Sequence, residues 1–284
     1  MYPDFLGIGA QKSGTAWLYE NLRIHNEISM TPVKELNYFN ETTPIPNVIR
    51  MFKSKWMLSQ LKWSVQRSLR EKRNIQIGWF LRFYFLLRND RWYSSLFSSD
   101  LGQKTGEVNP AYSILTENVV ARIQHLMPNL RIIYLLRNPI LRTWSQAALH
   151  FRIRGRKLEN VRDEELFETF GLDWVSRHSY YLRNLEKWEK FYSENQIFIG
   201  FFDQLSENPR DLLRNIYNFL EVDSSQNVIP DSADRKMNSG KYPEIPIRFS
   251  GYLAHKYYDQ IKQLHTRFAN RYTADWLEFA EKCL

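Results

Sequence analysis

The chain has 284 residues, of which 43% are hydrophobic, so it can bury a full core as one large domain. Its one cysteine is Cys283, which excludes a disulfide framework within the chain and favours a reducing, cytoplasmic setting. No apolar run is as long as a transmembrane helix, and no signal peptide precedes the first apolar segment. Either the protein is cytoplasmic or the chain begins after an anchor that has been removed.

Short apolar runs rich in Ile, Phe and Tyr predict strands that helices cover on both faces. These runs span residues 4–9, 131–136 and 196–202, with a further short strand expected at 104–108. Helical stretches are expected at residues 15–25, 116–126, 139–151, 180–192, 209–220 and 248–284. The alternation predicts a three-layer, P-loop-like α/β fold with a central, mainly parallel sheet flanked by helices. We expect a single domain over residues 1–284, with ligands bound beyond the carboxyl ends of the strands.

Residues 5–17 have the pattern of a buried strand, a turn between two glycines, and a helix. Gly9 and Gly14 enclose four residues, as in a nucleotide-binding P-loop, but the Walker lysine that should follow the second glycine is missing. The lysine lies inside the loop instead, at Lys12. A Walker lysine works beside a magnesium ion, which a neighbouring hydroxyl and an Asp hold. The pattern here indicates a loop of backbone N–H groups and hydroxyls at a helix N-terminus, suited to a compact anion.

This loop closely resembles the 5′-phosphosulfate loop of the sulfotransferases, which use 3′-phosphoadenosine-5′-phosphosulfate (PAPS). The resemblance implies that the donor binds to Gln11, Lys12, Ser13, Gly14, Thr15, Ala16 and Trp17. It also implies that Lys12 is catalytic, because its ammonium can stabilise the departing phosphate as negative charge develops there. Trp17 matches the aromatic residue that stacks on the adenine, although a tryptophan in a first helix is as often part of the core.

The segment 31–39 contains Lys34-Glu35 and, four residues after the glutamate, Phe39, which Tyr38 precedes. It resembles the Lys-Glu-x-x-x-Phe element of the heparan sulfate sulfotransferase branch and its bacterial relatives, which implies that Glu35 is the general base. The chemistry agrees, since a carboxylate beside the phosphosulfate can take the acceptor proton during in-line transfer. Lys34 and Tyr38 are candidates for acceptor binding, and an ordinary exposed lysine is an equal interpretation of Lys34.

The net charge of +8 is concentrated between residues 50 and 91, a segment that contains eleven basic residues and two acidic ones. The tryptophans in and beside this segment are Trp56, Trp63, Trp79 and Trp92. We interpret 45–97 as a basic, aromatic helical insertion. Its aromatics could be core and its charges a solvated face, or it could form an acceptor lid, a docking surface or a membrane-surface contact. No nucleic-acid module pattern appears, so nucleic acid is not expected as a partner.

Two later segments complete the expected site. Residues 106–112 resemble a Glu-Lys-Ser/Thr-Pro-x-Tyr element, with Val108 where a lysine is common and Asn109 as a candidate acceptor-binding residue. Arg137 follows a buried strand, Pro139 begins a helix, and Ser145 lies eight residues after the arginine. A guanidinium and a hydroxyl at one strand-to-helix junction can hold a phosphate together.

In sulfotransferases the same strand-Arg-x-Pro pattern binds the 3′-phosphate of PAPS, which implies that role for Arg137 and Ser145. The irregular segment 221–247 is long enough to suggest a function. Arg235, Lys236 and Lys241 occupy the place of the basic loop that closes over the 3′-phosphate in the family. His150, just past the helix, is a further candidate for the acceptor site, with a packed or surface histidine as the alternative.

The predicted function is transfer of a sulfuryl group from PAPS to a hydroxyl or amine of a carbohydrate, lipid or polyketide-type acceptor, without a metal. The Lys34-Glu35 element favours a glycan, whereas the basic aromatic segment favours an acidic or amphiphilic acceptor. A non-catalytic module that binds 3′-phosphonucleotides and a P-loop kinase for a small metabolite are the alternatives. The oligomeric state is left open.

Overall fold

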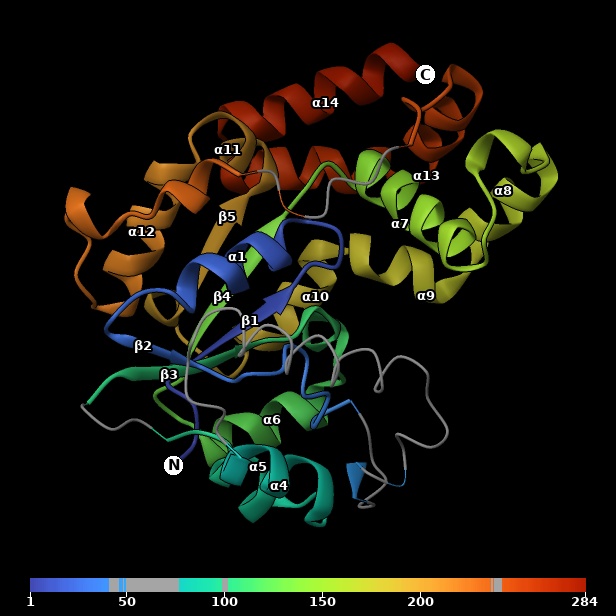
Figure 1. Ribbon diagram of the computed structural model, residues 1–284. Helices are drawn as coiled ribbons and strands as arrows, with labels where there is room; N and C mark the ends of the chain where they lie inside the picture. The colour runs from blue at the N-terminus through green and yellow to red at the C-terminus, as the bar shows by residue number, and fades with distance from the viewer. Residues whose placement is uncertain (41–45, 48, 50–76, 99–101, 236, 238–241) are drawn as a thin grey trace.

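A five-stranded parallel sheet forms the centre of the computed structural model (Figure 1), which describes residues 1–40, 46–47, 49, 77–98, 102–235, 237 and 242–284. The strands are β1 (Phe5–Gly9), β2 (Ile28–Met30), β3 (Lys104–Val108), β4 (Arg131–Leu136) and β5 (Ile197–Phe201). Their order is β2-β3-β1-β4-β5, and all four neighbouring pairs are parallel. The chain progresses in opposite directions from the central β1, which creates a switch point where ligands of such sheets bind.

Helices flank the sheet on both faces. Within the described residues the α-helices are α1 (Thr15–Leu22), α4 (Ile77–Phe85), α5 (Asp90–Ser95), α6 (Glu117–Leu126), α7 (Pro139–Ile153), α8 (Asp163–Gly171), α9 (Asp173–Ser176), α10 (Tyr181–Glu189), α11 (Phe202–Glu207), α12 (Pro209–Leu220), α13 (Ile247–Phe268) and α14 (Arg271–Cys283). The 3₁₀ helix η1 (Pro110–Ile114) follows β3 directly. Figure 1 shows α13 and α14, in red, lying side by side beyond β5.

The two faces of the sheet bury separate hydrophobic clusters, because successive residues of a strand point to opposite sides. Phe5 and Ile133 pack in one cluster with Trp17 of α1 and Leu213 of α12. Leu6, Ile132 and Tyr134 instead join a larger cluster with side chains from helices that include α6, α7, α10 and α13. Burial on both faces explains why the strands have continuous apolar sequences.

The structure confirms the predicted α/β architecture. All four predicted strands form, and each predicted helix is present, although α1 ends at Leu22 and not near His25. The sequence analysis did not predict β2, α8, α9 or α11, which are all short and lack a strong periodic pattern.

The described part of the predicted insertion, 45–97, contains α4 and α5. Trp79 and Trp92 are each 2% exposed and belong to the larger cluster, so the core interpretation is correct for these two residues. Trp56 and Trp63 lie outside the described residues, and the interpretation of 50–76 as a lid or docking surface therefore stays a prediction.

Close contact between β1 and β3 requires glycine at position 106, because a Cβ there would overlap the buried ring of Phe5. We expect Gly106→Ala to lower the free energy of unfolding by about 1–3 kcal/mol through overpacking, measured by urea denaturation. Gly171→Ala is the matched control, because nothing lies within 4 Å of a Cβ at that position. Equal stability of the two variants would contradict this account of the sheet.

Candidate active site

The turn between β1 and α1 has the backbone conformation of an anion-binding loop. Lys12 and Gly14 both have positive φ angles, 71° and 91°. Left-handed residues of this kind occur in concave nests of backbone N–H groups. Gly14 occupies the N-cap of α1 and has no side chain to cap it, so the first N–H groups of the helix remain available to an anion. A Cβ at position 14 would also lie 2.7 Å from Leu205 Cδ1, and this close approach is a second reason for glycine there.

Arg137, at the carboxyl end of β4, is fixed against this loop. Its guanidinium donates a hydrogen bond to the carbonyl of Lys12 at 3.0 Å and lies 4.3 Å from the ring centroid of Phe202. The hydroxyl of Tyr181 donates to the carbonyl of Arg137 at 2.7 Å. Arg137 also lines a groove of about 570 Å³ beside Leu141 of α7, so a ligand can reach its guanidinium. The structure therefore brings Arg137 and the loop together, as the sequence predicts.

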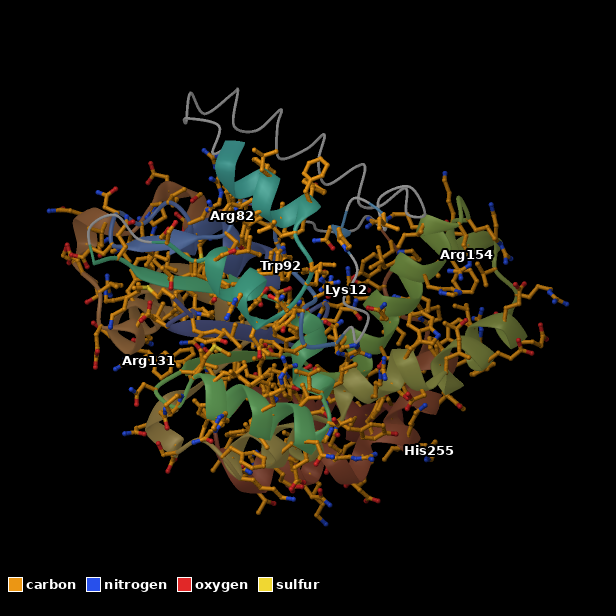
Figure 2. The ribbon with its side chains drawn as sticks, turned by 90° about the horizontal axis from the view of Figure 1, so that it is seen from below. Lys12, Arg82, Trp92, Arg131, Arg154 and His255 are labelled. Atoms are coloured by element: carbon orange, nitrogen blue, oxygen red, sulfur yellow. The ribbon has the colours of Figure 1, made fainter. Side chains whose placement is uncertain are left out.

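Positive charge is concentrated around Lys12. Burial lowers the pKa of the Lys12 ammonium to about 8, and the charges of Arg152, Arg137, Arg142 and Lys34 lower it further in the same direction. In Figure 2 Lys12 lies in the middle of the view, with Trp92 to one side and Arg154, the residue after α7, to the other. A ligand with several negative charges would relieve the mutual repulsion of these cations.

Lys34 connects the predicted base to the anion loop. Its ammonium lies 3.1 Å from Glu35 Oε1 and donates to Thr15 Oγ1 at 3.5 Å. The Lys34 side chain is 19% exposed and that of Glu35 is 34% exposed, so the Glu35 side chain remains partly accessible to solvent. Lys34 is thus an ion-paired and largely buried lysine, and acceptor binding by this residue stays a prediction.

The three other predicted acceptor-binding residues lie in hydrogen-bonded surroundings. The hydroxyl of Tyr38 donates to Asp90 at 2.6 Å and accepts from Arg122 at 3.0 Å. The buried amide of Asn109 donates to the side chain of Asn37 at 3.2 Å. The ring of His150 contacts Arg154, and burial followed by the Arg154 charge lowers the pKa of this imidazole. Acceptor binding by Tyr38, Asn109 and His150 stays a prediction.

The residues predicted to hold the nucleoside and the 3′-phosphate differ in burial. Trp17 is 1% exposed, and its indole donates to the carbonyl of Ala233 at 2.7 Å, so the ring is part of the core in this structure. Ser145 is 2% exposed on α7, and Arg235 is exposed. The remaining residues of the predicted late loop, Lys236 and Lys241, lie outside the described residues.

Two residues to which the sequence analysis assigned no role hold the segment around Glu35. The buried carboxylate of Glu107 accepts a hydrogen bond from the backbone N–H of Leu36 at 3.2 Å, and burial raises its pKa to about 7. The guanidinium of Arg88 donates to the carbonyl of Leu36 at 3.2 Å and to that of Asn37 at 2.7 Å. The place of Glu107 in the element of residues 106–112 was the available signal for the first. No local pattern marked Arg88.

Among the residues that the structure describes, no group of three His, Cys, Asp or Glu side chains could hold a metal ion. In the same part of the chain, no helix combines the length and the apolar character that crossing a membrane requires.

Comparison with known proteins defines the class of this α/β protein with an anion loop. The family model described as the sulfotransferase domain matches residues 2–242. The chain therefore belongs to the sulfotransferase family, as the resemblance of the loop predicts. No curated protein matches the chain.

Solved structures with the same fold include a sulfotransferase from Alicyclobacillus acidocaldarius, with a TM-score of 0.65 and 20% identity over 97% of this chain and 99% of that one. The sulfotransferase domain from the Synechococcus PCC 7002 olefin synthase has a TM-score of 0.52 and 17% identity, covering 85% of this chain and 81% of that one. The sulfotransferase domain from the curacin biosynthetic pathway has a TM-score of 0.51 and 15% identity, covering 85% and 82%.

The lowered pKa of Lys12 makes anion binding depend on pH. Below pH 8 the ammonium is charged and can bind phosphate, and above pH 8 it loses its proton. We expect the affinity for 3′-phosphoadenosine-5′-phosphate to fall by up to about tenfold per pH unit above pH 8, measured by calorimetry. Lys12→Arg should remove this dependence, because a guanidinium stays protonated. The same slope in both proteins would contradict the assignment.

Proposed function

We propose that the protein transfers a sulfuryl group from PAPS to a hydroxyl or amine, with Glu35 as the general base. The contact that supports this most directly is that of Lys34, which reaches both Thr15 of the anion loop and the Glu35 carboxylate. Because the base and the anion loop contact the same lysine, they lie close enough to act together, the base on the acceptor and the loop on the phosphosulfate.

The arrangement gives each residue a role in an in-line reaction. The loop and the N-terminus of α1 bind the 5′-phosphosulfate, and Arg137 with Ser145 binds the 3′-phosphate. The acceptor oxygen or nitrogen attacks sulfur while the bond from sulfur to the bridging phosphate oxygen breaks. Glu35 takes the acceptor proton, and the Lys12 ammonium stabilises the charge that develops on the departing phosphate.

The acceptor is a carbohydrate, lipid or polyketide-type molecule in this proposal. Its acidic or amphiphilic character is supported by the cations around Lys12 and by the outer side of the α4 region. The exposed apolar side chains there are Leu81 (54% exposed), Phe85 (58%), Leu86 (48%) and Leu87 (60%). Arg91 is exposed nearby in sequence, so an amphiphilic or membrane-bound acceptor would meet both apolar and basic groups.

Discrimination of the 3′-phosphate tests the role of Arg137. We expect 3′-phosphoadenosine-5′-phosphate to bind at least about tenfold more tightly than adenosine 5′-phosphate, because charge-assisted hydrogen bonds contribute about 1.5–3 kcal/mol. Arg137→Gln and Ser145→Ala should reduce this preference, measured by calorimetry. Arg210→Gln is the control, since Arg210 pairs with Asp231 and Asp234 on the surface. Equal binding of both nucleotides to the unchanged protein would contradict the proposal.

Nucleotide preference and PAPS turnover together separate the alternative functions. A P-loop kinase would prefer ATP and require magnesium. A non-catalytic docking module would bind 3′-phosphoadenosine-5′-phosphate tightly and release none of it from PAPS, whichever acceptor is offered.

Glu35→Gln tests the general base. We expect the release of 3′-phosphoadenosine-5′-phosphate from PAPS, with water or a panel of alcohols and amines as acceptors, to fall about 10²- to 10⁴-fold. Affinity for the product nucleotide should change less than about twofold, because the base acts in the transition state. Glu117→Gln, which breaks a surface pair with Lys190, should leave both quantities unchanged. A fully active Glu35→Gln enzyme would exclude Glu35 as the base.

A further inference from the structure

The segment that carries Glu35 has an unfavourable backbone. Glu35 and Asn37 have positive φ angles of 64° and 56°. Residues with a side chain, glutamate more than asparagine, enter this region at a free-energy cost, and they stay there only when their surroundings hold them. We call residues 34–38 the base loop, because Glu35 lies within it.

A buried carboxylate faces the amide groups of the base loop. Glu107 of β3 is fully buried, and its Oε2 accepts the N–H of Leu36 at 3.2 Å. Its Oε1 accepts the hydroxyls of Tyr93 at 2.7 Å and Tyr112 at 2.9 Å. Removing a carboxylate from water costs several kcal/mol unless donors of this kind surround it. Such a group is a costly way to fill a core position that only needs packing.

Tyr112 extends this network to a second amide. Its hydroxyl donates to Glu107 and accepts the N–H of Tyr38 at 3.0 Å. The carboxylate therefore fixes the amides on both sides of Asn37, one directly and one through Tyr112. Arg88 holds the carbonyls of Leu36 and Asn37 at the same place.

We propose that Glu107 is a positioning residue, which holds the base loop so that the Glu35 carboxylate points toward the acceptor. This inference rests on the proposed function, because it takes Glu35 as the base. Glu107 itself is too deeply buried to touch the substrate, so it acts through the backbone of residues 36 and 38. Burial raises its pKa to about 7, and the three donors are what favour its charged form.

Tyr93 and Tyr112 offer a matched pair of variants. Both hydroxyls are buried and donate to the same oxygen of Glu107, but of these two only the Tyr112 hydroxyl also accepts a backbone N–H of the base loop. The Tyr93 ring stacks on the ring of Tyr38, and Tyr93→Phe keeps this contact. Tyr112→Phe removes the acceptor of the Tyr38 amide. We expect hydrogen exchange at that amide to quicken by about tenfold and kcat for release of 3′-phosphoadenosine-5′-phosphate from PAPS to fall by about tenfold. Tyr93→Phe should change both by less than about threefold.

Glu107→Gln supplies the direct test, because glutamine has nearly the same size but only one accepting oxygen. We expect kcat to fall by about tenfold or more, with KM for PAPS and affinity for the product nucleotide nearly unchanged. Glu107→Asp should show the same pattern, because it keeps the charge but shortens the reach.

Equal losses of activity in Tyr93→Phe and Tyr112→Phe would overturn the proposal, because they would show that general stability and not the base loop is affected. Full kcat in Glu107→Gln would overturn it as well. Unfolding temperatures of all variants distinguish a folding defect from a positioning defect, and the tyrosine pair decides the matter should Glu107→Gln fail to fold. Full activity of Glu35→Gln would contradict the proposed base, whereas exchange at the Leu36 and Tyr38 amides reports whether Glu107 holds the loop in either case.

Discussion

Parallel pairing of β1 with both β3 and β4 is the constraint on which the rest of the site depends. Because parallel strands end at the same edge, the anion loop after β1, Asn109 after β3 and Arg137 after β4 are brought to one place. The anion loop lies more than ninety residues before Asn109 and more than a hundred and twenty before Arg137, and no local preference could assemble these segments. The close fit of Gly106 against Phe5 keeps β1 and β3 in this register.

The electrostatic character of the site follows from that assembly. Each cation would be well solvated alone, but Lys12, Lys34 and Arg137 are gathered where water is partly excluded. The lowered pKa of Lys12 reflects its burial first and the repulsion by the neighbouring cations second. Among the described residues, the carboxylate that forms an ion pair with one of these three cations is Glu35, which pairs with Lys34. A site of this kind favours a polyanion over a neutral ligand by charge alone.

The parts of the site that the sequence could predict are those that local order determines. The turn around Gly14 and the strand-Arg-x-Pro junction at Arg137 each carry their meaning within about fifteen residues, and both appear in the structure as expected. The hydrogen bonds of Glu107 and Arg88 could not be predicted, because they join segments fifty to seventy residues apart. Tyr38 illustrates the same limit, since its hydroxyl is committed to Asp90 and Arg122 by tertiary packing.

Helix α1 serves as a shared anchor for two parts of the chain. Its N-terminus carries the anion loop, while Trp17 binds the carbonyl of Ala233 and Asn21 accepts the hydroxyl of Ser232 at 2.7 Å. The segment that leads to Arg235 is therefore tied to the same helix that ends the loop. Because both are attached to one helix, a shift of α1 would move the anion loop and the segment before Arg235 together.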